Sequence, residues 1–431
     1  MAARFRAPKG TRDLLPPETA LWAAVEAIAR ETFERYGFRE IRTPLLEETE
    51  LFARGVGEGT DIVGKEMYSF VDKGGRNVTL RPENTASVCR AYVEHGMQQL
   101  PQPVKLFYIG PQFRYERPQK GRYRQFHQIG AELLGGFGQW ADAEVLLLLV
   151  AFLRELQFSG LKVLLNTVGD ESSRAAFRSA LVAYLEPRKD HLGEASRRRL
   201  ETNPLRILDS KDPEEQEVLS GAPHLRDHLS RASRNHFAGV CRLLESSGIE
   251  FELSPRLVRG LDYYTNTVFE IVSEGLGSQN AICGGGAYER LIEELGGKPT
   301  YAVGFAIGED RLIEVLPESF RRGIATRCRV IVAPIGTASS HGAKSLYAEG
   351  VLDGALLVCD YFRRNGISAE WAAGKPERVF KIAEGTGARF AVFVGEEELA
   401  AGRVSLRDLE TREQEQMTRE EALNFLQRFL P

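Results

Sequence analysis

Cysteine is scarce in this sequence, and its scarcity excludes several kinds of disulfide-stapled or metal-bound protein. Only five cysteines occur among 431 residues, and no two of them form a CxxC pair. An odd number of scattered cysteines disfavours both a disulfide framework and a structural zinc site. His224 and His228 have the spacing of a metal pair, but no third ligand stands near them, so we assign no metal site. We therefore expect a protein of a reducing compartment.

Long hydrophobic runs are missing as well. The run Val145–Leu153 is the longest; it lies between Glu144 and Arg154 and is too short to cross a bilayer. We interpret it as part of a buried helix over residues 142–157. Residues 1–8 contain no apolar segment of the kind that a secretory signal requires. These absences favour a cytoplasmic protein without a membrane partner.

The sequence also lacks a strong excess of one charge. Lys and Arg together number 56 and Asp and Glu 60, so the net charge is −4 with neutral histidines. This balance does not by itself indicate a nucleic-acid partner, and a site for a polyanion must be a local basic patch. A chain of 431 residues is long enough for two or three domains.

The order of helix and strand patterns predicts a multidomain protein with α+β and α/β parts. Helical patterns dominate residues 171–250, which we interpret as an insertion, and a domain boundary is expected within 317–325. Before the boundary, strands are expected at 78–80, 104–117, 122–134, 251–255, 265–272 and 301–307, and helices at 18–36, 82–94 and 142–157. Beyond the boundary, the α/β alternation predicts strands at 329–333 and 389–394 and helices at 345–365 and 418–430.

The most informative stretch is a predicted hairpin over residues 107–132. Side chains on a strand alternate between two faces. One face of the second strand carries polar groups around a lone aromatic ring, namely Arg124, Phe126, Gln128, Gly130 and Glu132. On the first strand, the same spacing puts Gln112, Arg114 and Glu116 together. This face is either a solvated surface with cross-strand ion pairs or a ligand site.

Three features favour the ligand site. Gly130 leaves room on the polar face, and Phe126 offers an isolated ring for a base to stack on. The turn brings together Arg117, Lys120 and Arg122, which would attract a phosphate group.

Several segments resemble motifs of the histidyl-tRNA synthetases, a family of class II aminoacyl-tRNA synthetases. They are TLRPENT (79–85), FRYERPQKGRYRQFHQIGAE (113–132), LVRGLDYYT (257–265) and YAVGFAIGEDRL (301–312). The segment CGGGAYER (283–290) is similar to the family's glycine segment, with Ala287 where arginine is usual. Asn84 also departs from the family, which more often has glycine or methionine there. TPLLE (43–47) resembles motif 1, which forms the dimer interface in the family.

The resemblance covers nearly the whole chain and implies its fold. It implies a class II antiparallel sheet with flanking helices, a helical insertion and a C-terminal α/β anticodon-binding domain. The implied catalytic domain comprises residues 1–170 and 251–322, with the insertion at 171–250 and the anticodon-binding domain at 326–431. It also implies a homodimer.

The resemblance further implies a role for each candidate site residue. Arg259 and Arg114 would be the catalytic cations at the α-phosphate of ATP. The histidine-binding residues would be Glu83, Thr85, Gln128, Glu132, Tyr263, Tyr264 and Tyr288. The ATP-binding residues would be Arg114, Glu116, Arg122, Phe126 and Arg311. Imidazole has two ring nitrogens that each need a partner, and Glu132 and Tyr264 would serve them.

The implied activity is that of a histidine–tRNA ligase. L-Histidine would react with ATP, with Mg²⁺ on the outer phosphates, to give histidyl-adenylate and pyrophosphate, and histidine would then pass to the 3′ end of tRNA(His). Three other kinds of protein are disfavoured. A regulatory subunit of ATP phosphoribosyltransferase and an RNA-binding protein without catalysis are disfavoured by the C-terminal domain and by Arg114, Arg259 and Arg311. A class II synthetase for threonine or proline is disfavoured by LVRGLDYYT and Glu132.

Overall fold

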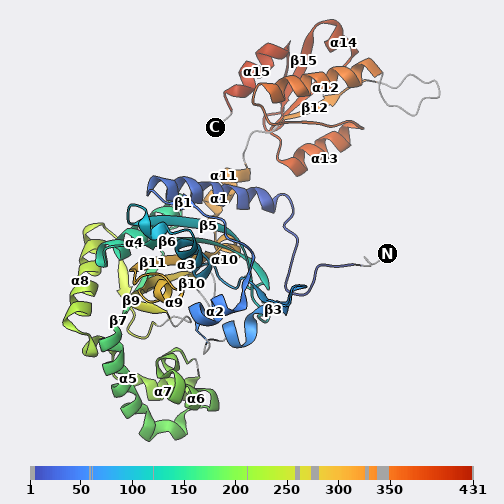
Figure 1. Cartoon of the computed structure of the whole chain (residues 1–431). Helices are drawn as coiled ribbons and strands as arrows, with labels where there is room; N and C mark the ends of the chain where they lie inside the picture. The colour runs from blue at the N-terminus through green and yellow to red at the C-terminus, as the bar shows by residue number, and fades with distance from the viewer. Residues whose placement is uncertain are drawn as a thin grey trace. The chain divides into compact units, whose positions relative to one another are not determined.

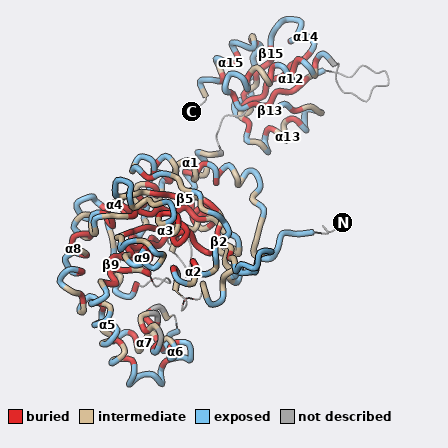
Figure 2. Tube along the Cα trace, viewed as in Figure 1, coloured by how far each residue is buried: buried red, intermediate tan, exposed pale blue. Residues whose placement is uncertain are grey.

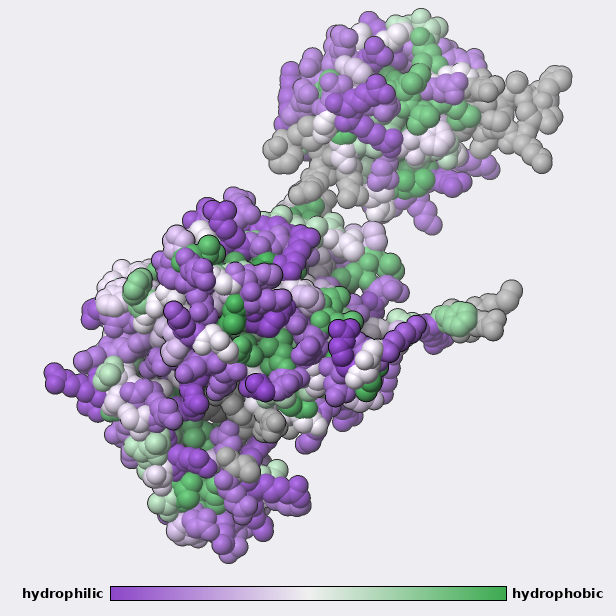
Figure 3. Space-filling model, viewed as in Figure 1, coloured by the Kyte–Doolittle hydropathy of each residue, from purple (hydrophilic) through white to green (hydrophobic). Residues whose placement is uncertain are grey.

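The computed structural model describes residues 5–57, 60, 62–119, 121–210, 212–257, 263–272, 281–325, 330–336 and 349–429. The chain divides into two compact units, Met1–Pro317 and Glu318–Pro431, and each is described by itself (Figure 1). Among the described residues, no helix has the length and hydrophobicity needed to span a membrane. The face drawn in Figure 3 is mostly hydrophilic in both units, with smaller hydrophobic areas.

A large mixed sheet forms the centre of the first unit. In sheet order its strands are β1 (Arg39–Glu40), β5 (Val104–Phe113), β6 (Gln125–Leu134), β11 (Ala302–Gly308), β10 (Ala281–Tyr288), β9 (Tyr264–Val272), β7 (Lys162–Gly169) and β8 (Phe251–Leu253). The outer pairs β1–β5 and β7–β8 are parallel, and all inner pairs are antiparallel. The expected antiparallel sheet is thus confirmed, with one parallel pair at each edge.

Helices cover this sheet and bury its faces, as the red centre of Figure 2 shows. They include α1 (Glu18–Arg35), α3 (Thr85–Glu94), α4 (Gln139–Glu155), α8 (Arg231–Ser246), α9 (Leu291–Glu294) and α10 (Glu309–Glu314). On α1, an apolar residue at every third or fourth position makes one buried face. Its Phe33 ring meets Phe107 of β5 and Phe305 of β11 edge-on, at 5.4 and 5.9 Å between centroids. The apolar run of α4 is buried, as predicted.

A small sheet positions the start of α3. It consists of β2 (Leu46–Glu48), β4 (Asn77–Leu80) and β3 (Tyr68–Val71), and α2 (Thr49–Val56) follows its first strand. From β4 the chain enters α3 through a loop held by Arg81, whose guanidinium donates to the backbone oxygens of Pro111 and Thr43. This loop places Glu83, and Thr85 at the start of α3, against the large sheet.

Residues between β7 and β8 form a helical lobe whose core is continuous with the edge of the sheet at Val168 and Val268. Its helices α5 (Glu171–Leu185), α6 (Glu194–Thr202) and α7 (Pro213–Ser220) lie beyond the edge of the sheet in Figure 1, and α8 returns along α4. The core includes Phe177, Leu181, Leu185, Ile207 and Leu219. The prediction that helices dominate this stretch is confirmed.

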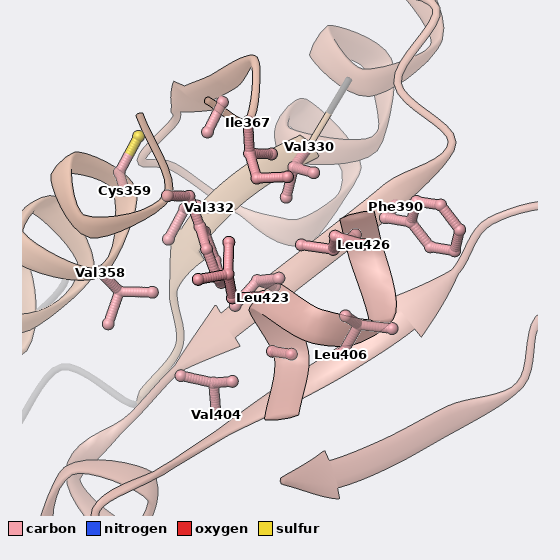
Figure 4. Packing of buried hydrophobic residues seen from close by; sticks show 14 of the residues in the cluster. Val330, Val332, Val358, Cys359, Ile367, Phe390, Val404, Leu406, Leu423 and Leu426 are labelled. Atoms are coloured by element: carbon pink, nitrogen blue, oxygen red, sulfur yellow. The ribbon is translucent and has the colours of Figure 1, made fainter. Parts of the chain in front are cut away.

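The second unit is an α/β fold. Its sheet has the order β13 (Ala369–Trp371), β12 (Val330–Pro334), β14 (Phe390–Val394), β15 (Arg403–Asp408) and β16 (Gln414–Thr418), and only the first three strands are parallel to one another. The helices are α11 (Glu318–Ala325), α12 (Glu349–Arg364), α13 (Pro376–Thr386), α14 (Glu396–Ala400) and α15 (Arg419–Gln427). Figure 4 shows side chains of α12 and α15 packing over the sheet, around Val332, Leu423 and Leu426.

The predicted strands at 104–117 and 122–134 are too long. β5 ends at Phe113 and β6 begins at Gln125. Beyond Phe113 the backbone finds other partners: Tyr115 N–H donates to the Glu66 carbonyl at 2.7 Å. Arg114 and Glu116 therefore belong to the connection between the strands, and the prediction that they continue the polar face of the first strand is wrong.

Candidate active site

Two neighbouring cavities open over the middle of the large sheet. The smaller, of about 130 Å³, is lined by four tyrosines, Tyr108, Tyr263, Tyr264 and Tyr288, and we call it the tyrosine cavity. The larger, of about 290 Å³, is lined by Arg114, Arg122 and Arg311, and we call it the arginine cavity. Arg114 and Gln128 line both cavities, so the two meet at these side chains.

The tyrosine cavity gathers residues from distant parts of the chain. Its wall includes all seven predicted histidine-binding residues, Glu83, Thr85, Gln128, Glu132, Tyr263, Tyr264 and Tyr288. They come from the loop before α3, from α3 itself, from β6, and from the beginning of β9 and the end of β10. A solvated sheet face, the alternative interpretation of the hairpin, is wrong because both Gln128 and Glu132 are buried.

Glu132 is the polar centre of this cavity, with 1% of its surface exposed. One carboxyl oxygen accepts from the Thr85 hydroxyl at 2.7 Å and the other from the Tyr288 hydroxyl at 2.8 Å. Burial raises the pKa of Glu132 to about 8. A carboxylate can accept about four hydrogen bonds, so Glu132 can still accept one from a ligand N–H.

Gly304 of β11 makes room for this carboxyl. The two residues pair across the strands, and a Cβ built on Gly304 would lie 1.8 Å from a carboxyl oxygen of Glu132. Real Cβ atoms do not approach an oxygen so closely, so only glycine is compatible with this position of Glu132.

Two further side chains offer oxygen atoms to a ligand. Glu83 is buried and accepts from the backbone N–H groups of Thr85 and Ala86 at 2.7 and 3.0 Å, and burial raises its pKa. The side-chain carbonyl of Gln128 is buried and has no hydrogen-bond partner among the described residues. A buried carbonyl without a partner is costly, so a ligand donor beside Gln128 would be stabilised. An ammonium group fits this pair of acceptors.

Arg114 lies where the two cavities meet, and a backbone carbonyl and an aromatic ring fix its side chain. Its Nε donates to the Pro82 carbonyl at 2.8 Å, and its guanidinium lies 5.3 Å from the centre of the Phe126 ring. Glu116 accepts from Arg122 at 3.1 Å and lies 3.9 Å from Arg114. Arg114 is therefore oriented while its charge still faces both cavities.

Arg311 also lines the arginine cavity. Its Nη1 donates to the Ala281 carbonyl at 3.0 Å and its Nε to that of Gly121 at 3.3 Å. Burial and the nearby positive charge of Arg122 lower its pKa. Three guanidinium groups around one cavity suit a ligand with several negative charges, such as a polyphosphate. All five predicted ATP-binding residues line this cavity.

Other sequence predictions had different outcomes. Arg259 and Lys120 lie outside the described residues. The interpretation of Gly130 is wrong: a Cβ there would lie 2.3 Å from the Tyr108 ring, so the space belongs to this tyrosine and not to a ligand. The sequence analysis missed Tyr108 as a wall of the cavity. The pairing of the two strands could have indicated it, because Tyr108 lies directly opposite Gly130 in the hairpin.

A largely antiparallel sheet that bears an amino-acid-sized cavity beside an arginine-lined one is the catalytic fold of class II aminoacyl-tRNA synthetases. Residues 10–312 match the family model "Histidyl-tRNA synthetase", and residues 329–429 match "Anticodon binding domain". The chain belongs to the histidyl-tRNA synthetase family.

Individual relatives agree along the whole chain. The histidine–tRNA ligase of Solibacter usitatus is 47% identical over 418 residues and that of Synechococcus sp. (strain JA-3-3Ab) is 48% identical over 424, with 97% and 98% of both chains covered. Among solved structures, apo histidyl-tRNA synthetase of S. aureus matches with a TM-score of 0.78 and 33% identity, covering 98% of this chain and 99% of that one.

Proposed function

We propose that this chain is a histidine–tRNA ligase. In the first step a carboxylate oxygen of L-histidine attacks the α-phosphorus of ATP, and pyrophosphate leaves. In the second step the ribose hydroxyl at the 3′ end of tRNA(His) attacks the histidyl carbonyl carbon, and AMP leaves. The observation that carries this proposal is that the tyrosine and arginine cavities meet at Arg114 and Gln128. Adenylation needs an amino acid and a nucleotide joined at one such place.

The tyrosine cavity would hold histidine. Glu83, Thr85 and Gln128 would bind its ammonium group, since two of them present oxygen acceptors there. Glu132 and Tyr264 would bind the two imidazole nitrogens, and Tyr263 and Tyr288 would complete the wall. An amino acid without a ring N–H would leave the remaining acceptor position of Glu132 unfilled, and a site built to bond a polar ligand group rejects ligands that lack it.

The arginine cavity would hold ATP. Phe126 would stack on adenine, Glu116 would contact adenine or the tRNA end, and Arg122 and Arg311 would bind the outer phosphates. Arg114 and Arg259 would stabilise the negative charge that grows on the α-phosphoryl oxygens in the transition state.

Magnesium fits the donors present in the arginine cavity. Three carboxylates, Glu116, Glu270 and Asp310, line its wall, and carboxylate oxygens are the ligands that Mg²⁺ prefers. When bound, the ion would neutralise charge on the outer phosphates of ATP.

The same proposal extends to partners and parts of the chain. Residues 1–170 and 251–322 would form the catalytic domain, 171–250 the insertion and 326–431 the anticodon-binding domain. The enzyme would act as a homodimer in the cytoplasm, with residues 43–47 at the dimer interface.

Charging of tRNA(His) with radiolabelled histidine tests the proposal. We expect ATP-dependent attachment to tRNA(His) and none to tRNA(Thr) or tRNA(Pro). Histidine binding without charging of any tRNA would refute it and would favour a regulatory histidine-binding protein instead.

A further inference from the structure

The helical lobe joins the sheet where the chain enters it at Asp170 and leaves it at Ser230, and its core also packs on Val168 of β7 and Val268 of β9. Asp170 caps α5, its carboxylate accepting from Ser173 N–H at 2.8 Å, and Ser230 caps α8, its hydroxyl accepting from Ser233 N–H at 3.1 Å. The two caps also bind each other: Ser230 Oγ donates to Asp170 at 2.6 Å, and Asp170 N–H donates to Ser233 Oγ at 2.9 Å. The start of α5 is therefore fixed relative to α8.

One residue on the first turn of α5 extends this attachment to the tyrosine cavity. Arg174 donates from Nη1 to the backbone carbonyl of Tyr264 at 3.0 Å. Tyr264 begins β9 and lines the cavity, and its ring lies 4.7 Å from that of Tyr263. Arg174, a residue of the lobe, thus fixes the backbone of Tyr264, a residue of the cavity.

The Tyr264 side chain packs against both sides. It contacts the core of the lobe, around Phe177, and also the core behind the cavity, around Tyr288. The ring also lies against Gly286, where a Cβ would be only 2.8 Å from its Cδ1. A shift of α5 must therefore move Tyr264 or break its bond to Arg174.

We propose that Arg174 is a positioning residue that couples the placement of the helical lobe to the binding of histidine. The inference rests on the proposed function, because it assigns Tyr264 to the histidine pocket. Coupling between two sites is reciprocal, so histidine in the cavity also stabilises α5 in its position against Tyr264. The Arg174–Tyr264 hydrogen bond and the packing of the Tyr264 ring on the lobe core link the lobe to the cavity.

The kinetic test is pyrophosphate exchange with Arg174→Ala in the full chain. We expect the KM for histidine to rise about tenfold, as for loss of one charged hydrogen bond, while the KM for ATP stays at the wild-type value and the thermal midpoint falls by no more than about 2 °C. Arg174→Lys should recover part of the histidine affinity. Arg178→Ala is the matched control, since it removes the same charge from an exposed position one turn further along α5.

Hydrogen exchange supplies a readout that a general loss of stability would not reproduce. In the wild type and in Arg178→Ala, saturating histidine should slow exchange both at the cavity strands and along α5. In Arg174→Ala it should slow exchange at the cavity strands alone. An unchanged KM for histidine, or an equal rise of both KM values with a lower thermal midpoint, would overturn the inference. Absence of exchange activity in the wild type would instead refute the proposed function.

Discussion

Glu132→Gln keeps the size of the side chain at the centre of the tyrosine cavity and removes its ability to ionise. Burial raises the pKa of Glu132 to about 8, while a carboxyl of the unfolded chain titrates near about 4.3. Between these values the folded protein retains a proton that the unfolded chain has released, so stability falls as pH rises. From pH 6 to pH 8 this group should lower the free energy of unfolding by about 2 kcal/mol.

The assay compares thermal unfolding of the ligand-free wild type and of Glu132→Gln at pH 6 and pH 8. The wild-type midpoint should fall by about 3 °C more than that of the variant, at about 1.5 °C per kcal/mol for a unit of this size. Glu250→Gln, at an exposed position outside the cavity, should behave as the wild type. If wild type and Glu132→Gln show the same pH dependence, the assignment of a buried, protonated carboxyl is wrong.

The same variant should bind histidine poorly. The amide nitrogen cannot accept from imidazole N–H, and a buried donor left without an acceptor costs about 1 to 3 kcal/mol. The KM for histidine in pyrophosphate exchange should therefore rise by roughly 10- to 100-fold, with little change in the KM for ATP. A wild-type KM for histidine would show that Glu132 does not contact the imidazole.

Three further substitutions test other parts of the account. Gly304→Ala places a methyl group 1.8 Å from a carboxyl oxygen of Glu132. The KM for histidine should therefore rise at least about tenfold, and the KM for ATP should not change. An equal KM for histidine in the wild type and the variant would contradict this geometry. Arg259→Ala should abolish adenylation without loss of fold or dimer, and unchanged pyrophosphate exchange would refute its catalytic role. Phe390→Ala leaves a cavity in the buried core of the second unit and destabilises it by about 3 to 5 kcal/mol. tRNA charging should then fall while histidine-dependent pyrophosphate exchange persists. Loss of both activities would contradict the assignment of adenylation to the first unit and of tRNA binding to the second.

Local patterns in the sequence predicted much of the first unit because its elements are strongly periodic. The stripe of α1 and the apolar run of α4 each identify a buried helix face without knowledge of the partner. The alternation of Phe126, Gln128 and Glu132 on β6 placed two cavity residues on one face. A two-residue period is a property of the strand itself, so it can be read before the neighbouring strands are known.

Features set by distant contacts could not be read in this way. The polar alternation continues past Phe113, but β5 ends there because the backbone of Tyr115 bonds to Glu66, far away in the sequence. The glycine triplet gave no strand signal, yet it lies in β10, where a Cβ on Gly285 would meet the Gly304 carbonyl at 2.3 Å. Only the paired strand explains why glycine is needed there.

Weakly patterned strands of the second unit were also missed. β16 is a mostly polar edge strand, and β13 has only three residues, so neither shows an apolar alternation. Edge strands need few apolar residues because one side lacks a neighbour. The resemblance alone implied that Arg114 and Arg311 serve one ligand, since no spacing in the sequence relates residues so far apart; both line the arginine cavity.

The measurement that tests the central claim most directly is ATP–pyrophosphate exchange by the purified protein, with each of the twenty amino acids in turn. The account predicts exchange with histidine and background rates with the others, because Glu132 and Tyr264 would each bind one nitrogen of the imidazole ring. Exchange driven by another amino acid, or no exchange with histidine while histidine still binds, would contradict it.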